Sequence, residues 1–298
     1  MLNKEQVDAF ESDGFLVLPD FVPRAECAAL LNYSRGLAAQ LSWEVQRMDF
    51  LPTLDSPKHE DYFLTSGDKI RVFFEKAGIA AMGPAEPGWQ GVDKIGHALH
   101  DLDPMFDEFS RDSRLDAICR QTGMVDPLLL QSMVIFKQAH RGGEIDIHQD
   151  AAWLYTEPGS VLGFWFALED ATIENGCMWA QPGGHRTGLR SRFRRRPDGS
   201  AGMDWSDADG CQVPEEHFVP LEASAGTLIV LHGFCPHRSG PNRSRHARGS
   251  YSLHVIDGAC RYPEDNWLQR SPAMPLRGFD LKLKTIEELP APIPAFQF

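Results

Sequence analysis

Basic residues are in short supply along this chain of 298 residues. Lysine and arginine together number 29, against 42 aspartates and glutamates, which gives a formal net charge of −13 at pH 7. A general affinity for nucleic acid needs clustered cations that release the counterions of the phosphate backbone. The charge balance therefore argues against nucleic acid as a partner.

Long apolar runs are also missing. No segment approaches the roughly 20 apolar residues that a helix needs to cross a bilayer. The opening residues lack the basic and then apolar layout of a signal peptide, and the final residues, AFQF, are not a peroxisomal signal. We expect a cytoplasmic protein that does not insert into membranes.

Several common functional motifs are absent as well. The sequence has no Gly-x-Gly-x-x-Gly, no P-loop and no Gly-x-Ser-x-Gly, so the nucleotide-binding and serine-hydrolase interpretations lose their main support. The six cysteines are scattered and form no Cys-x-x-Cys pair, which gives no indication of zinc or dithiol chemistry. We expect buried, reduced thiols.

The pattern of short apolar runs predicts the fold class. Helices are expected over 4–11, 23–47 and 94–122, the last of them broken at Pro104. A short β run is expected over 15–18, and a turn feeding an extended piece is expected over 67–76. Short β runs follow, separated by glycine, proline and asparagine: 128–138, 144–150, 161–168, 177–180, 226–232 and 249–257. This order favours a mainly β protein with flanking helices, built as a double-stranded β-helix of the jelly-roll or cupin-like type.

We expect one domain over 1–298. Residues 1–125 would form a helical N-terminal flank, 126–260 the barrel core with a loop insertion at 181–214, and 261–298 a C-terminal tail. The insertion is rich in arginine: Arg186, Arg190, Arg192, Arg194, Arg195 and Arg196. These cations form either a solvated loop or a lid beside the barrel mouth that meets an anionic substrate.

Acidic residues surround a single histidine in the segment 144–150, which reads EIDIHQD. In an extended strand, alternation places four side chains on one face: Glu144, Asp146, His148 and Asp150. Like charges at this spacing repel one another, and a bound metal ion would relieve the repulsion. Strand parity alone does not choose between Asp146 and Asp150 as the carboxylate that would join His148.

A His-x-Asp pair supplies two neighbouring ligands of the two-histidine, one-carboxylate triad that holds ferrous iron and leaves other coordination positions open. The third ligand must come from elsewhere in the chain, and both His232 and His237 are candidates. Because His-x-Asp is common by chance, the pair needs support from other residues.

An arginine at the start of a β run provides that support. Alternation over 248–255 places four polar side chains on one face: Arg248, Ser250, Ser252 and His254. A polar inner face is expected where a barrel holds a ligand. A dicarboxylate fits Arg248, because a guanidinium binds a carboxylate through two parallel hydrogen bonds. An ion pair with a neighbouring acid explains the arginine equally well.

The sequence resembles the phytanoyl-CoA dioxygenase family of iron- and 2-oxoglutarate-dependent oxygenases. The resemblance runs nearly end to end. It is carried by SDGFLVLPDFV, DYFLTSGDKIRVFFEK, DKIGHALHDLDPMF, QSMVIFKQAHRGGEIDIHQDAAWLYTEP, ALEDATIENGCMWAQPGGH and PEDNWLQ. Motifs of this length are far more specific than a three-residue spacing.

The resemblance implies a ligand set. His148, Asp150 and His237 match the iron ligands of the family and would be the catalytic metal site. Arg248 matches the residue that binds the far carboxylate of 2-oxoglutarate. His237 is preferred over His232 because the family places its arginine about eleven residues beyond the distal histidine.

Further contacts with 2-oxoglutarate are implied at Lys94, Met133, Trp165 and Ser239. Each position also has an ordinary explanation. Lys94 could cap a helix in solvent, Met133 could fill the core, and Trp165 could serve packing alone. Ser239 could be a turn residue.

The implied activity is oxidation of a C–H bond in a small-molecule substrate, coupled to decarboxylation of 2-oxoglutarate to succinate and CO2. Fe(II), 2-oxoglutarate and O2 are the implied cofactors, with ascorbate in support. Because Asp150 is present where related halogenases have a small residue, hydroxylation or another C–H oxidation is expected. The alternatives are a 2-oxoglutarate-binding sensor with little turnover, a metal-dependent hydrolase, and a purely structural barrel.

Overall fold

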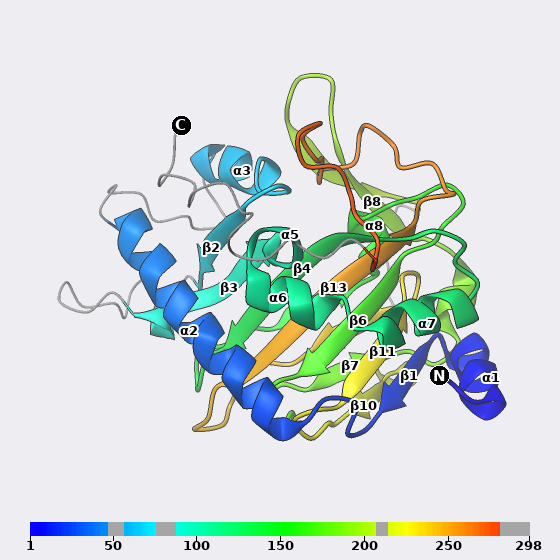
Figure 1. The fold of residues 1–298 in the computed structure, drawn as a ribbon, viewed down its shortest axis with the longest axis horizontal. Helices are drawn as coiled ribbons and strands as arrows, with labels where there is room; N and C mark the ends of the chain where they lie inside the picture. The colour runs from blue at the N-terminus through cyan, green and yellow to red at the C-terminus, as the bar shows by residue number, and fades with distance from the viewer. Residues whose placement is uncertain (47–56, 76–87, 207–213, 281–298) are drawn as a thin grey trace.

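The computed structural model describes residues 1–46, 57–75, 88–206 and 214–280 (Figure 1). Expectations for Cys211 and for the last part of the C-terminal tail lie outside these residues. In the part of the chain that is described, no helix combines the length and the apolar character needed to span a bilayer.

A seven-stranded antiparallel sheet forms the centre of the molecule (Figure 1). Its strands, in spatial order, are β1 (Phe15–Leu18), β11 (Leu228–His232), β6 (Leu162–Ala167), β13 (Arg248–Asp257), β4 (Pro127–Lys137), β3 (Val92–His97) and β2 (Ile70–Phe74). Strand β13 is buried over its whole length, because it pairs with β6 on one side and β4 on the other.

A smaller antiparallel sheet packs against the first. It contains β10 (Val219–Leu221), β7 (Met178–Ala180), β12 (His237–Ser239) and β5 (Ile145–His148). Apolar side chains of β6 and β11 meet those of β7 and β10 between the two sheets. The two layers form the sandwich of a jelly roll, and β13 turns its polar face toward the interior between them.

Helices cover the other face of the large sheet (Figure 1). They are α2 (Arg24–Gln46), α5 (Leu99–Leu102), α6 (Pro104–Ser110) and α7 (Ser113–Gln121). Helix α1 (Lys4–Asp13) lies beside β1 at the edge of the sheet, and α3 (Pro57–Leu64) packs in a separate cluster with Trp267 and Leu268. The apolar stripe of α2, including Leu30 and Leu31, shares one core with Tyr251 and Leu253 of β13. The alternation along β13 therefore separates an apolar face under the helices from the polar face of Arg248 and its neighbours.

The N-terminal flank differs in part from the expectation. Strand β1 matches the short β run expected over 15–18, and β2 lies in the extended piece expected within 67–76. Together with β3 they join the large sheet, so the sheet begins well before residue 126. The segment 92–97 forms β3 rather than the start of a helix, because its backbone is paired with β2 on one side and β4 on the other. Such pairing overrides a local helical preference. The predicted break at Pro104 does occur, with Asp103 capping α6.

The described part of the C-terminal tail packs onto the domain. Trp267 and Leu268 are 1% and 0% exposed and lie in a cluster with residues of α3 and α8 (Asp150–Trp153). Arg277 forms an ion pair with Asp101 at 2.7 Å. Residues 261–280 therefore belong to the packed structure, and the division into one domain with a flank, core and tail stays a prediction.

The arginine-rich insertion contains a hairpin of β8 (Ser191–Arg195) and β9 (Ala201–Trp205). Its arginines contact groups of this same chain. Arg192 pairs with Asp265, Arg194 with Asp204 and Asp265, Arg195 with the carbonyls of Leu64 and Trp267, and Arg196 with Asp204. The segment is thus a docked hairpin rather than a solvated loop, because these partners hold it against the residues that follow β13.

We expect Arg195→Ser to lower the free energy of unfolding by about 1–3 kcal/mol, since it removes hydrogen bonds to the main-chain carbonyls of two buried residues. Arg196→Ser is the matched control and should change stability little, because its pair with Asp204 is exposed to solvent. Urea denaturation of both variants measures the difference. If both variants lose the same free energy of unfolding, the structural role of Arg195 is contradicted.

Candidate metal centre

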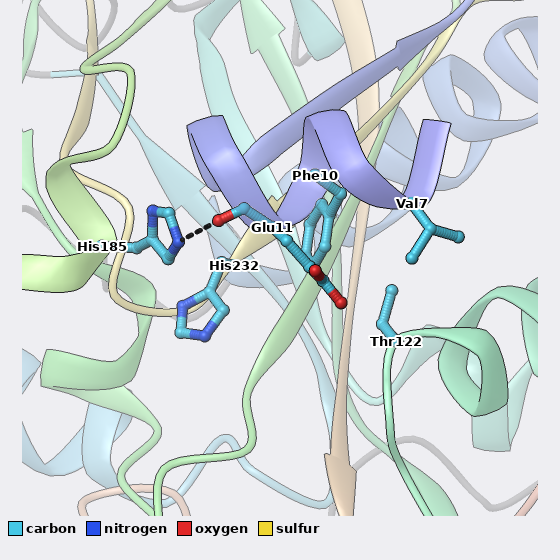
Figure 2. Close-up of a pocket in the computed structure, with 6 residues that line it drawn as sticks. All are labelled: Val7, Phe10, Glu11, Thr122, His185 and His232. Atoms are coloured by element: carbon cyan, nitrogen blue, oxygen red, sulfur yellow. Dashed lines mark hydrogen bonds between the residues drawn. The ribbon is translucent and has the colours of Figure 1, made fainter. Parts of the chain in front are cut away.

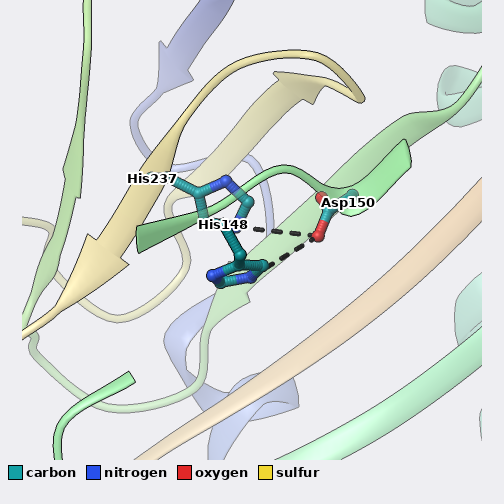
Figure 3. A group of neighbouring side chains, drawn as sticks. All are labelled: His148, Asp150 and His237. Atoms are coloured by element: carbon teal, nitrogen blue, oxygen red, sulfur yellow. Dashed lines mark ion pairs between the residues drawn. The ribbon is translucent and has the colours of Figure 1, made fainter. Parts of the chain in front are cut away.

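Two histidines meet where β5 and β12 pair. His148 on β5 lies directly opposite His237 on β12, and their ring centroids are 4.2 Å apart. Asp150 opens α8 two residues after His148, and its Oδ1 lies 3.8 Å from Nε2 of His148 and 3.6 Å from Nε2 of His237 (Figure 3). In the described part of the chain, this is the one group of three His, Cys, Asp or Glu residues arranged to hold a metal ion.

Main-chain carbonyls orient both imidazoles. Nδ1 of His148 lies 2.8 Å from the carbonyl oxygen of Asp146, and Nδ1 of His237 lies 3.0 Å from that of Cys235. Each Nδ1–H donates to its carbonyl, which leaves the lone pair on Nε2. Both free nitrogens therefore face Asp150 in the tautomer that binds a metal.

The electrostatics of the site suit a cation. Burial alone would raise the pKa of Asp150, but His254 and His237 beside it hold that pKa below its ordinary value. Burial, with the neighbouring His237, lowers the pKa of His148 to about 4. At neutral pH, Asp150 is therefore ionised and His148 is neutral, which are the forms that metal ligands take.

The predicted crowding of three acids around His148 does not occur. Strand β5 ends at His148, and the chain then turns into α8, so Asp150 does not follow the parity of the strand. The side chains of Glu144 and Asp146 are exposed, whereas Asp150 is buried. Glu144 forms an ion pair with Arg238 at 3.9 Å, Asp146 is open to solvent, and Asp150 alone faces the histidines.

His232, the other candidate for the third ligand, lies in a different place. It borders a cavity of about 250 Å³ together with Phe10, Glu11 and His185, as Figure 2 shows. Its Nδ1 accepts a hydrogen bond from the amide of Phe234. The structure thus brings His237, and not His232, beside His148 and Asp150.

Four of the five residues expected to contact 2-oxoglutarate share the inner face of the large sheet, and the fifth, Ser239, lies on β12 of the smaller sheet. Trp165 of β6 lies opposite Ser252 of β13, and Ser252 lies opposite Met133 of β4. Directly opposed residues of antiparallel strands point to the same side of a sheet. By the same register, Lys94 of β3 and Arg248 of β13 also face inward.

Arg248 is a buried cation without a carboxylate partner among the described residues. It is 2% exposed, and burial lowers the pKa of its guanidinium to about 10. Nη1 donates to Oγ of Ser250 and Nη2 to the carbonyl of Gly176, both at 3.0 Å. Its Nε and the Oγ of Ser239 on β12 are buried without a hydrogen-bond partner. A buried cation that keeps an unpaired donor indicates a site for an anion.

Two buried polar residues received no role from the sequence. Nε2 of His254 lies 3.3 Å from Oδ2 of Asp150. Lys137 lies opposite Arg248 across β4 and β13, and its Nζ donates to the carbonyls of Gly143 and Gly240. The signals were a histidine on the same strand face as Arg248, and a lysine in an otherwise apolar run.

Residues 10–250 match the family model described as phytanoyl-CoA dioxygenase (PhyH). The chain belongs to the phytanoyl-CoA dioxygenase family. It is 40% identical over 283 residues to phytanoyl-CoA dioxygenase domain-containing protein 1 of Mus musculus, covering 92% of this chain and 97% of the mouse protein. It is 38% identical to phytanoyl-CoA dioxygenase of Arabidopsis thaliana, covering 91% and 94%.

The fold is similarly shared with solved structures. The crystal structure of the epimerase SnoN in complex with Fe3+, alpha ketoglutarate and nogalamycin RO superposes with a TM-score of 0.62 and covers 91% of each chain at 18% identity. The similarity to this structure confirms the predicted jelly-roll fold. Membership of the phytanoyl-CoA dioxygenase family confirms the prediction that the protein is a dioxygenase.

Proposed function

We propose that this phytanoyl-CoA dioxygenase family member is a non-haem Fe(II)- and 2-oxoglutarate-dependent dioxygenase that oxidises a C–H bond of a small molecule. The observation that carries the proposal is the pairing of two features. The side chains of His148, Asp150 and His237 form a group that could hold a metal ion. On the polar face of β13, which is turned toward the interior between the two sheets, the buried Arg248 has no carboxylate partner among the described residues.

The donor set fits the proposed groups. Two imidazoles and one carboxylate are the ligands that non-haem Fe(II) takes when positions must stay open, and His148, Asp150 and His237 would hold it. Arg248 and Ser239 offer buried donors without partners to the far carboxylate of 2-oxoglutarate. When bound, iron would supply the oxidative decarboxylation of 2-oxoglutarate to succinate and CO2, coupled to oxidation of the substrate, with O2 as the oxidant of both.

The protein would contribute a prepared anion site. Ser250 and the carbonyl of Gly176 hold the guanidinium of Arg248 in one position, so little rotamer entropy is lost when a carboxylate binds. The ring of Trp165 lies 5.4 Å from that guanidinium and excludes water from one side. Lys94 and Met133, on the neighbouring strands, would line the same face. The Asp150 carboxylate supports oxidation rather than halide transfer.

A metabolite screen that measures succinate release tests the proposal. The assay contains purified protein, Fe(II), ascorbate, 2-oxoglutarate and one candidate small molecule at a time. We expect succinate and oxidised substrate in equal amounts, with matching O2 uptake. Calorimetric binding of 2-oxoglutarate without O2 uptake would support the sensor alternative. Turnover without O2 and 2-oxoglutarate would support a metal-dependent hydrolase.

A further inference from the structure

The two carboxylate oxygens of Asp150 have different neighbours. Oδ1 faces the Nε2 atoms of His148 and His237, at 3.8 and 3.6 Å. Oδ2 points the other way and lies 3.3 Å from Nε2 of His254 on β13. One oxygen therefore faces the ligand histidines, and the other faces the sheet.

His254 is built into the sheet at this point. Its side chain is buried, with 6% of the residue exposed, and its Nδ1 has no hydrogen-bond partner. Since Asp150 is its polar neighbour at hydrogen-bonding distance, the tautomer that places the proton on Nε2 gives the Asp150 carboxylate a donor and leaves the unpartnered Nδ1 without a proton.

Gly163 leaves room for this contact. It lies directly opposite His254 across β6 and β13. A Cβ at this position would lie 3.0 Å from Oδ2 of Asp150 and 3.6 Å from Cδ2 of His254. The two polar groups thus meet over a glycine, where a side chain would press against the carboxylate.

We propose that His254 is a positioning residue whose Nε2–H donates to Oδ2 of Asp150 and holds Oδ1 toward His148 and His237. The torsion that turns a carboxylate is soft, so a hydrogen bond to one oxygen selects which oxygen faces the metal. With Oδ2 engaged, Asp150 offers a single oxygen and occupies a single coordination position. This inference rests on the proposed function, because it assumes that Asp150 is a metal ligand.

A comparison of two substitutions tests the hydrogen bond. His254→Leu introduces an apolar side chain of comparable size and removes the donor, whereas His254→Gln keeps an N–H donor. Titration with Co(II), without 2-oxoglutarate, gives the affinity and the visible spectrum of the bound ion. We expect His254→Leu to weaken Co(II) binding about 10- to 100-fold and to change the spectrum, and His254→Gln to retain most of the affinity with the wild-type spectrum.

His232→Gln is the matched control, because this histidine lies outside the metal group in the described structure. It should bind Co(II) as the wild type does. Circular dichroism and urea denaturation without metal check that each variant is folded, and His254→Ala replaces His254→Leu if the latter is not. Wild-type affinity and spectrum in a folded variant that lacks the donor would overturn the proposal, as would a folded His254→Gln that binds as weakly as His254→Leu.

Turnover plays no part in this measurement, so the two proposals fail separately. A wild-type chain that binds Co(II) with high affinity but releases no succinate would contradict the proposed function. The role of His254 would still be decided by the titration. A wild-type chain that binds no Co(II) would overturn both.

Discussion

Asp150→Ala is expected to abolish turnover of 2-oxoglutarate and to reduce metal affinity by more than about 100-fold. Removal of a hydrogen-bonding neighbour of a ligand already costs 10- to 100-fold, and Asp150 is the only carboxylate of the described group. The remaining imidazoles of His148 and His237 would carry no negative charge to offset that of the ion. Co(II) titration and succinate release measure the two effects.

Asp146→Ala is the matched control for this substitution. Asp146 stands on the other side of His148 at the same spacing, but its side chain is exposed and its carbonyl, which orients His148, is kept by alanine. Metal affinity and turnover should therefore stay close to those of the wild type. If Asp146→Ala loses metal binding as Asp150→Ala does, the assignment of the carboxylate ligand is wrong.

The contrast between these two acids shows what the sequence could predict about the site. Alternation predicted the polar face of Arg248 and Ser250 on β13, because a strand paired on both sides keeps a strict period of two. The same rule applied to 144–150 was misleading, since the chain leaves the strand after His148. The direction of the family motif, rather than strand geometry, selected Asp150.

Contacts between segments that are distant along the chain could not be predicted from the sequence. The contact of His254 with Asp150 depends on the packing of β13 beside the start of α8, and the partners of the hairpin arginines come from the segment after β13. The strand at 92–97 was missed because only its pairing with β2 and β4 identifies it. Local patterns predicted most strands near the centre of the fold, where burial is most regular.

Arg248→Leu is expected to raise the dissociation constant for 2-oxoglutarate at least about 30-fold. Removing one partner of a buried, hydrogen-bonded charge pair costs about 2 kcal/mol or more, and Arg248 is the buried cation of this face with a donor left free. Arg248→Lys should give a dissociation constant between those of the wild type and Arg248→Leu, because lysine keeps the charge but lacks the planar guanidinium that binds both carboxylate oxygens. Calorimetry with the Mn(II)-loaded protein measures the affinity.

Arg238→Lys is a suitable control for Arg248→Lys. Arg238 lies on β12 between His237 and Ser239, but alternation turns it to the other face, where it lies over the rings of Trp179 and Phe218. Its replacement should leave 2-oxoglutarate binding unchanged, although the two substitutions have the same chemistry. A folded Arg248→Leu variant that binds 2-oxoglutarate with wild-type affinity would refute the anion site. In that case the buried guanidinium would serve the packing of β13 through Ser250 and Gly176 alone.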